Sequence, residues 1–581
     1  MPGVRSEEDQ PSKVLGRRRA AQIDAVPLLV TLAAGLICYG LFYNRGLGLP
    51  VIGYNIAPAE RVMQGEVPYR DFLFNYTPGI LWLNALLMRA FGATLMATRI
   101  GLLAFKLITL ITLFQVARRL TSGWAALVPV ALTLAWLGYE QIFNVYPDQY
   151  LVLFALAGLI CMLNYDETGH ARWLLLCGLA IGVVFVFKYN VGVLLFGSGA
   201  LAIVARELMM TRGIKGATRR VGVYLIGFAV VAGALAAYLA YNHAFGAMIN
   251  HFLHHAAEYR KIRSVTLPPA RVVLPAALAS LAAIIVGLVM LRRAARFFGA
   301  YVAAVLGIGS IVLLAPGKAA LLNQSAIAAV AYFPPLIFLA ALAVAIWQLK
   351  DNQRSVASWW RDNGAITITG LFAIAVYLEV FPRADFYHLV RVLPPVFLFF
   401  CALLVRCLPA FREHLRTHVP SPNRVALLTV STPLIFLLLA GVQVTWAPEF
   451  YSGFRFRDNR ELTLERGRGI FVEEQQAELV EGLVQLIQAN SSQDDYIFSF
   501  AQRGSGLYFL AGRRNPTRFL WWRSVGISGE EREAVMTMIG NRRAKLIVVR
   551  DVAVNKEFQD FIGNNYDHIG TVADIAVYGL R

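Results

Sequence analysis

Charged residues are scarce in this chain, and acidic residues are scarcer than basic ones. Only 15% of the 581 residues are charged, and 36 acidic residues stand against 54 basic ones, which gives a formal net charge of +18. At the same time 57% of the residues are hydrophobic and the mean hydropathy is +0.56. A soluble protein of this composition would be hard to keep in solution, whereas a polytopic membrane protein carries excess Lys and Arg in its cytoplasmic loops. The composition therefore predicts an integral membrane protein.

Several sequence features that would indicate other classes of protein are also missing. The five cysteines lie in or beside apolar runs, which favours apolar packing and gives no sign of a disulfide framework or a thiolate metal site. The C-terminal part has no glycine-rich phosphate loop and no nucleophile elbow. Lys and Arg are scattered between apolar runs and form no single stripe, so we expect no nucleic-acid partner. The cysteines are Cys38, Cys161, Cys177, Cys401 and Cys407.

Long apolar runs fill residues 25–446, and from about residue 449 the sequence is that of a soluble domain. The run that follows Arg17, Arg18 and Arg19 is long and has no small-residue cleavage site, so it predicts a first transmembrane helix rather than a removed signal peptide. We predict about thirteen membrane spans of roughly 20 residues each. They are 25–43, 94–116, 123–140, 148–165, 173–187, 190–205, 221–242, 271–291, 298–315, 326–347, 364–381, 389–406 and 425–445.

Basic residues cluster at alternate ends of these runs, which sets the expected topology by the positive-inside rule. Residues 1–24 would be a cytoplasmic segment, 25–446 a transmembrane bundle and 447–581 an extracytoplasmic domain. Lys188 interrupts the run 173–205, which predicts two short spans that meet at this lysine on the outer side.

The first outer loop, 44–92, is too long for a turn. Its stretches 58–64 and 78–91 have helical periodicity, begin with a proline and are amphipathic, so we expect helices along the membrane surface. In the tail, 473–489 and 529–540 have helical spacing, whereas the short apolar runs 496–500, 544–549 and 574–580 predict strands. The predicted fold is a polytopic α-helical membrane protein with a C-terminal soluble α/β domain.

Polar groups at membrane depth are costly, and here they gather at the predicted outer ends of the spans. Carboxylates and cations are mixed there. Such a mixture suits a lipid-linked sugar phosphate, because cations hold the anionic leaving group and a carboxylate takes the proton of an acceptor hydroxyl. These groups include Glu60, Arg61, Arg70, Asp71, Asn75, Tyr146, Asp148, Lys188, Tyr189, His251, Glu379, Arg383, Asp385 and His388.

Several segments resemble the GT-C superfamily of multi-span glycosyltransferases. The segment 61–72 (RVMQGEVPYRDF) resembles the first-loop signature, and 146–150 (YPDQY) resembles the second-loop Pro-Asp element. The segments 178–190 and 382–389 (PRADFYHL) are similar to later elements, and 508–519 (YFLAGRRNPTRF) is similar to the tails of bacterial members. The spans followed by an external α/β tail resemble the protein O-mannosyltransferase and lipid A aminoarabinose transferase branch.

The resemblance implies a GT-C-like fold and a polyprenyl-phosphate-sugar donor. It also implies inverting single displacement onto a cell-envelope glycan, lipid or protein, at the outer face of a bacterial plasma membrane. One feature departs from the family pattern. In the family an Asp stands about a dozen residues before the loop glycine and serves as the base, but the segment at that distance from Gly65 begins with Val51 and holds no carboxylate.

Two other carboxylates are the candidates for the base, and both have an alternative role. Asp71 either acts as the base or forms a local ion pair with Arg70, and Asp148 either serves the site or caps a helix. Lys188 either binds phosphate or extends to the interface. The donor phosphate is expected to contact Arg70, Lys188, Arg383 and His388. The substrates are expected to contact Asn75, Tyr146, Tyr189 and Asp385.

No cofactor is expected with certainty, and a divalent metal stays an open alternative. His251, His254 and His255 have i, i+3, i+4 spacing that presents imidazoles on one helix face, yet no carboxylate stands at zinc-site spacing, which favours an amphipathic interfacial helix.

Two other functions stay open. The chain could be a non-catalytic relative that binds a lipid-linked glycan, or a transporter or flippase of such a glycan, although no internal repeat indicates a transporter.

Overall fold

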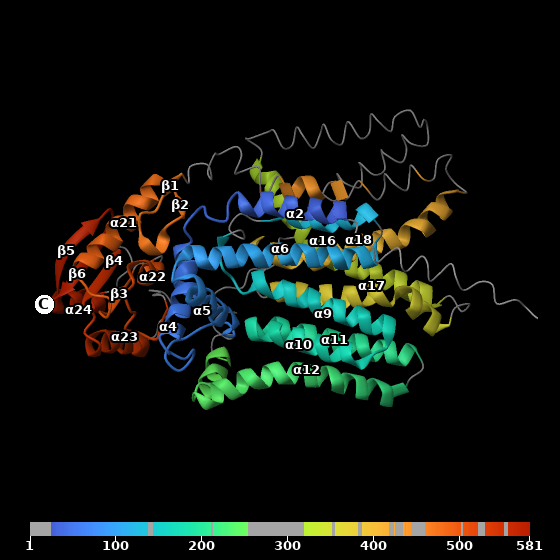
Figure 1. Ribbon diagram of the computed structural model, residues 1–581, viewed down its shortest axis with the longest axis horizontal. Coiled ribbons are helices and arrows are strands. Elements are labelled where there is room, and N and C mark those ends of the chain that lie inside the picture. Colours follow the sequence, from blue (N-terminus) through green and yellow to red (C-terminus); the bar gives the residue numbers. More distant parts are fainter. Residues whose placement is uncertain are drawn as a thin grey trace, which may run out of the picture.

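The computed structural model describes most of the chain (Figure 1). The described residues are 25–121, 123–137, 143–210, 213–253, 319–350, 355–381, 386–416, 459–500, 504–520, 529–550 and 556–581, with isolated positions between 423 and 445. Long helices run side by side and form a bundle. The tail lies beyond one end of the bundle, and the short helices of the first outer loop lie between the two.

The bundle helices follow the predicted apolar runs closely. They are α2 (Ala25–Gly40), α6 (Leu95–Leu120), α7 (Leu127–Ala135), α9 (Asp148–Thr168), α10 (Ala171–Phe187), α11 (Tyr189–Met209), α12 (Gly213–Tyr241), α16 (Ala319–Lys350), α17 (Val356–Tyr377) and α18 (Phe386–Arg416).

The prediction of about thirteen spans is confirmed in part. Six described segments are long and apolar enough to cross a membrane: Leu95–Leu120, Asp148–Thr168, Tyr189–Met209, Gly213–Tyr241, Val356–Val380 and His388–Pro409. Shorter apolar helices such as α2 and α10 accompany them. The predicted spans 271–291 and 298–315 lie outside the described residues, as does most of 425–445.

Large apolar side chains on the outside of the bundle face away from the protein core. On α2 and α12 they include Leu29, Ile37, Leu225, Ile226 and Val230, each between 48% and 61% exposed. In water such helix faces would be unstable, whereas lipid tails solvate them. This distribution agrees with a membrane-embedded bundle.

Helices α10 and α12 pack with almost no space between their backbones. A Cβ atom at Gly178 would lie 2.2 Å from the carbonyl oxygen of Tyr224, and one at Gly227 would lie 2.2 Å from that of Leu175. Small residues let membrane helices approach this closely, so that packing replaces the hydrophobic driving force that is missing in lipid.

Helices α10 and α11 are separated by a single residue. Lys188 has extended backbone dihedrals of φ −156° and ψ 103°, which end α10 and begin α11. The predicted interruption of the apolar run at Lys188 is therefore confirmed.

The first outer loop contains α3 (Leu49–Val51), the π-helix η1 (Ile52–Ile56), α4 (Ala57–Met63) and α5 (Gly79–Phe91). The two predicted loop helices are thus confirmed to within a residue. Pro58 lies in the first turn of α4 and Pro78 caps α5, where a missing backbone N–H costs little.

The tail is a small α/β unit. Its sheet has the order β3-β4-β6-β5, with β3 parallel to β4 and the other pairs antiparallel. The strands are β3 (Ile497–Ser499), β4 (Leu546–Arg550), β5 (Tyr566–Val572) and β6 (Ile575–Leu580). A short pair, β1 (Arg460–Glu461) and β2 (Phe471–Val472), precedes them, and the helices are α21 (Glu474–Ala489), α22 (Leu507–Ala511), α23 (Gly529–Asn541) and α24 (Lys556–Asn565).

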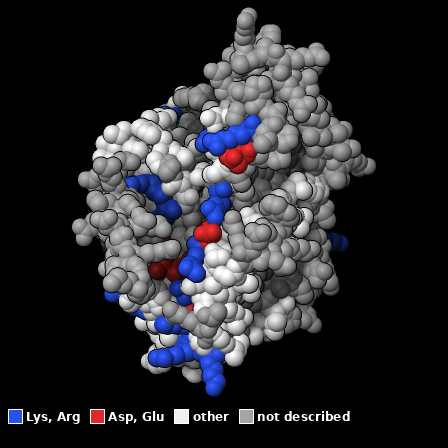
Figure 2. All heavy atoms as spheres, turned by 90° about the vertical axis from the view of Figure 1, so that its right-hand side faces the viewer, with Lys and Arg blue, Asp and Glu red and all other residues white. Residues whose placement is uncertain are grey.

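The end of the bundle opposite the tail is rich in basic side chains (Figure 2). There Arg206 donates to Asp166 at 3.0 Å and to Glu207 at 2.7 Å, and Trp360 donates to the same Asp166 oxygen at 2.8 Å. These bonds link α9, α11 and α17 at the end where the positive-inside rule expects the cytoplasm.

The first outer loop and the tail are joined by polar contacts and close packing. Glu60 pairs with Arg466 at 2.7 Å, and Arg61 donates to the carbonyl oxygen of Thr517 at 3.1 Å. A Cβ atom at Gly53 would lie 2.1 Å from Oγ and 2.5 Å from the carbonyl carbon of Ser505. Only glycine therefore fits where η1 meets the tail.

We expect Gly53→Ala to weaken this contact, because overpacking against backbone typically costs about 1–3 kcal/mol. Thermal unfolding of the purified protein in detergent measures the loss. Gly233→Ala is the matched control, since a Cβ at Gly233 on α12 meets nothing within 4 Å. Equal melting temperatures for the two variants would contradict the close packing.

Candidate functional site

Four charged side chains form a buried cluster, called here the charge cluster, that consists of Asp148, Lys188, Glu379 and Arg391. The ammonium group of Lys188 lies 2.7 Å from Oδ1 of Asp148 and also pairs with Oε1 of Glu379. Arg391 donates to Oδ2 of Asp148 at 2.8 Å. Two cations thus meet two carboxylates.

Each member of the charge cluster comes from a different part of the bundle. Asp148 is the first residue of α9, and Lys188 is the break between α10 and α11. Glu379 lies in the 3-10 turn η4 (Leu378–Val380) after α17, and Arg391 lies in the second turn of α18. Helix ends and breaks therefore bring charges from segments far apart in the sequence into one place.

The charge cluster is almost inaccessible to solvent. Asp148, Lys188 and Glu379 are 4%, 6% and 7% exposed. Charges at this depth persist only when they are paired, because an unpaired buried ion costs several kcal/mol. Aromatic rings complete the surroundings: the Arg391 guanidinium lies 4.3 Å from the centroid of Tyr146, and the Lys188 ammonium lies 5.5 Å from that of Tyr76.

Another buried cation, Lys106 on α6, lies beside the charge cluster. It donates to Oε1 of Gln149 at 2.7 Å, and its ammonium lies 5.0 Å from the ring centroid of Tyr39. In the part of the chain that the structure describes, no ion pair joins Lys106 to a carboxylate. Lys106 is only 5% exposed, so its charge has less compensation than a buried ion normally receives.

Lys106, Asp148 and Arg391 line one cavity, called here the Lys106 cavity. Gln149 and Thr109 add polar groups, and the remaining surface is largely apolar, with Leu110, Leu113, Leu137, Val152 and Val390. Nε of Arg391 is buried and has no hydrogen-bond partner among the residues that the structure describes. The cavity thus combines cationic donors with an apolar lining, which fits an amphipathic anion.

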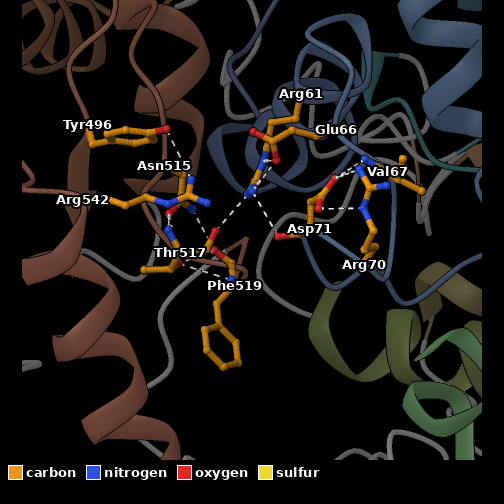
Figure 3. A network of polar contacts seen from close by, with 10 residues as sticks. All are labelled: Arg61, Glu66, Val67, Arg70, Asp71, Tyr496, Asn515, Thr517, Phe519 and Arg542. Carbon is orange, nitrogen blue, oxygen red and sulfur yellow. Dashed lines mark hydrogen bonds and ion pairs between the residues drawn. The ribbon is translucent and has the colours of Figure 1, made fainter. Parts of the chain in front are cut away.

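Asp71 and Arg70 lie apart from the charge cluster, in the first outer loop. Arg70 donates to both Asp71 oxygens at 2.9 and 2.8 Å, and the Val67 amide donates to Oδ2 at 2.7 Å (Figure 3). The hydrogen bond from Arg70 holds the pKa of Asp71 below its usual value. These contacts correspond to the alternative in which Asp71 fixes the loop, and the catalytic role predicted for it stays a prediction.

The other predicted site residues have varied surroundings. Asn75 bonds to the ring of His251 at 3.0 Å, and Tyr189 stacks on Phe252 with ring centroids 4.5 Å apart. His388 interacts electrostatically with both carboxylates of the charge cluster. Arg383, Asp385, His254 and His255 lie outside the described residues. Within the described residues, no group of three or more His, Cys, Asp or Glu side chains is placed to hold a metal ion.

The segment in which the family resemblance leads us to expect an Asp is buried against the tail. Val51 is 6% exposed, and Gly53 contacts Ser505 in the turn Gly504–Gly506. A carboxylate at this contact would lack water, so an apolar segment there is physically consistent.

The sequence analysis missed Lys106 and Arg391 and gave Glu379 no role. Lys106 lies inside the apolar run 94–116 and Arg391 inside 389–406. A single cation within an apolar run is a recognised sign of a functional position, and that rule would have found both.

Residues 75–237 match the model of a family described as dolichyl-phosphate-mannose-protein mannosyltransferase. The resemblance to the GT-C superfamily, in its mannosyltransferase branch, is confirmed. The matched region contains Lys106, Asp148 and Lys188, whereas Glu379 and Arg391 follow it. No protein of curated function matches the chain.

Two solved structures are similar to this one. The oligosaccharyltransferase of Archaeoglobus fulgidus in its apo form is 12% identical, with a TM-score of 0.48, over 90% of this chain and 69% of that chain. ArnT from Cupriavidus metallidurans in the apo state is 13% identical, with a TM-score of 0.49, over 98% of each chain.

We expect Lys188→Met to destabilise the protein strongly, by about 3–5 kcal/mol, because it leaves two buried carboxylates to share one cation. Adding Glu379→Gln should recover part of this loss, since it removes one of the two negative charges. Thermal unfolding in detergent measures both. Arg70→Met is the control, because a solvent-exposed pair contributes at most about 1 kcal/mol. Absence of any recovery in the double variant would contradict the pairing.

We also expect Asp71 to make stability depend on acid pH. Its pKa is lowered by folding, so its stabilising contribution is present above the ordinary pKa of Asp and is lost as pH falls through the lowered value. Asp71→Asn should therefore have a slightly lower melting temperature than the wild type at pH 7. Between pH 7 and pH 3 its melting temperature should fall less than that of the wild type. An identical pH dependence in the two proteins would refute the local ion pair.

Proposed function

We propose that this protein is a membrane glycosyltransferase that moves a sugar from a polyprenyl-phosphate donor to a cell-envelope glycan, lipid or protein. The family match of residues 75–237 supports glycosyl transfer at a membrane. The choice of donor rests on the Lys106 cavity. There the buried ammonium group of Lys106 has no carboxylate partner among the described residues, and the cavity is lined by both polar and apolar side chains.

A phosphate bound in the Lys106 cavity would supply the missing negative charge. Lys106 and Nε of Arg391 would donate to its oxygens, and charge-assisted bonds of this kind are about twice as strong as neutral ones. The apolar lining formed by Leu110, Leu113 and Val152 would take the first isoprene units. A soluble nucleotide sugar has no use for such a lining, so a lipid-linked donor fits better.

In the transfer step, Lys106, Lys188 and Arg391 would stabilise the negative charge that develops on the leaving phosphate. Asp148 would fix Lys188 and Arg391, since it accepts a hydrogen bond from each. The sugar would move by single displacement with inversion, which requires one base for the acceptor hydroxyl. Asp71 and Asp148 stay the bases proposed from sequence.

Residues around this centre would contact the substrates. Arg70, Arg383 and His388 are further candidates for the donor phosphate, and His388 lies within electrostatic range of the charge cluster. Asn75, Tyr146, Tyr189 and Asp385 are candidates for sugar or acceptor contacts.

The proposed orientation places the charge cluster and the tail at the outer face of a bacterial plasma membrane. The basic end of the bundle in Figure 2 would face the cytoplasm together with residues 1–24. Residues 447–581 would then form an extracytoplasmic domain above the first outer loop.

One observation favours a second function. Because Val51 stands where the family has its base, the chain could be a non-catalytic relative that binds a lipid-linked glycan. Such a protein would keep the Lys106 cavity and lose transfer. The experiment below separates the two functions.

We expect a deletion strain to lack one envelope glycan modification and to accumulate the corresponding lipid-linked sugar, both measured by mass spectrometry. Complementation with Lys106→Met should restore less than a tenth of the modification, because loss of one buried charge-assisted bond costs about 1.5–3 kcal/mol. Lys215→Met, at an exposed position on α12, is the matched control and should restore it fully. Unchanged glycans and lipid carriers in the deletion strain would exclude the transferase.

A further inference from the structure

We infer that Glu379 is the general base of the transfer and that Asp148 is a positioning residue for the cations. This inference rests on the proposed glycosyltransferase function and assigns the base that the first outer loop lacks. The assignment follows from how the oxygens of each carboxylate are engaged by cations among the described residues.

Both oxygens of Asp148 are already engaged. Oδ1 accepts a hydrogen bond from Lys188 at 2.7 Å, and Oδ2 accepts one from Arg391 at 2.8 Å. A general base must have a lone pair within hydrogen-bond reach of the proton that it takes. If Asp148 took the proton, it would lose the negative charge that pairs with both Lys188 and Arg391, in a site where unpaired charges are costly.

Both oxygens of Asp71 are engaged as well. Arg70 bonds to each of them, and the Val67 amide adds a third hydrogen bond. Among the described residues, Asp71 makes no ion pair with Lys106, Lys188 or Arg391. Its backbone oxygen and side chain belong to a network with Arg61 and Arg70 (Figure 3). A base there would be separated from the leaving group.

Glu379 differs from both carboxylates. Its Oε1 pairs with Lys188, whereas Oε2 accepts no hydrogen bond within the part of the chain that the structure describes. Glu379 lies in η4, directly after the end of α17.

Lys188, which pairs with both Asp148 and Glu379, would bring the leaving phosphate close to the proposed base Glu379. Lys188 lies between Asp148 and Glu379, so a phosphate held by Lys188 would lie next to Glu379. His388 lies within electrostatic range of Glu379. The acceptor hydroxyl would then approach from the side of η4, and the phosphate would leave toward the Lys106 cavity.

The step balances without a further reactant. The acceptor hydroxyl gives its proton to Oε2 of Glu379, and its oxygen forms a bond to the anomeric carbon of the sugar. The bond from that carbon to the phosphate oxygen breaks, and its electron pair stays on the phosphate. Polyprenyl phosphate leaves with the cations of the site as counter-charges, and the configuration at the anomeric carbon is inverted.

The test compares Glu379→Gln, Glu379→Asp and Asp148→Asn as purified full-length proteins. Membranes of the deletion strain hold unused donor and unmodified acceptor, so they serve as substrate for initial rates, with kcat and KM taken from their concentration dependence. Binding of farnesyl phosphate, followed by tryptophan fluorescence, reports the phosphate site separately. Thermal unfolding confirms that each variant is folded.

Glu379→Gln should lower kcat at least 100-fold, as expected when a general base is removed, and leave farnesyl phosphate affinity within about threefold. Glu379→Asp keeps a base in a displaced position and should lower kcat less, by roughly tenfold. Asp148→Asn should instead raise KM and weaken farnesyl phosphate binding. Glu413→Gln, which alters an exposed carboxylate on α18, should match the wild type.

The inference fails if wild-type protein transfers sugar and Glu379→Gln keeps kcat within threefold. It also fails if Asp71→Asn or Asp148→Asn abolishes kcat without weakening farnesyl phosphate binding. Wild-type protein that transfers no sugar would overturn the proposed function itself, and the role of Glu379 with it. If Glu379→Gln does not fold, Glu379→Asp provides the test. An unchanged kcat in Glu379→Asp would contradict the role of Glu379 as a general base, because that role depends on the position of the carboxylate.

Discussion

The pairing of Lys188 with two carboxylates is the interaction on which the rest of the bundle depends. An extended residue between α10 and α11 places one ammonium group between α9 and the turn after α17. Because an ion at this depth is stable only with its partners, the pairing fixes how these segments lie relative to one another. Arg391 extends the same constraint to α18 through Asp148. The same ion pairs thus determine both the geometry of the site and the arrangement of these helices.

Much of the fold follows from local sequence patterns. Apolar runs fix the bundle helices, and two prolines mark the loop helices, since both signals act within a few turns of chain. Strand β5 was not predicted, because its exposed residues leave little apolar pattern and its stability comes from pairing with β6. The break at Lys188 was predictable because a charge interrupts an apolar run.

The site was predictable only in part, since its contacts span long distances in sequence. Asp148 and Lys188 were both singled out, but the partners Arg391 and Glu379 are 243 and 191 residues away from them. Such pairs leave no local pattern. Asp71 shows the opposite case: its neighbours 67 and 70 are close in sequence, and the alternative of a local ion pair was visible from the start.

The contact between the beginning and the end of the chain has a consequence for biosynthesis. Backbone bonds join Asn44 and Gly46 to Phe471, so the first loop emerges from the ribosome long before its partner exists. During that interval the surface around Gly53 has nothing to cover it. The loop can therefore complete its structure only after the tail has been synthesised, and a nascent chain arrested before residue 460 would leave the surface around Gly53 open to chaperones and proteases.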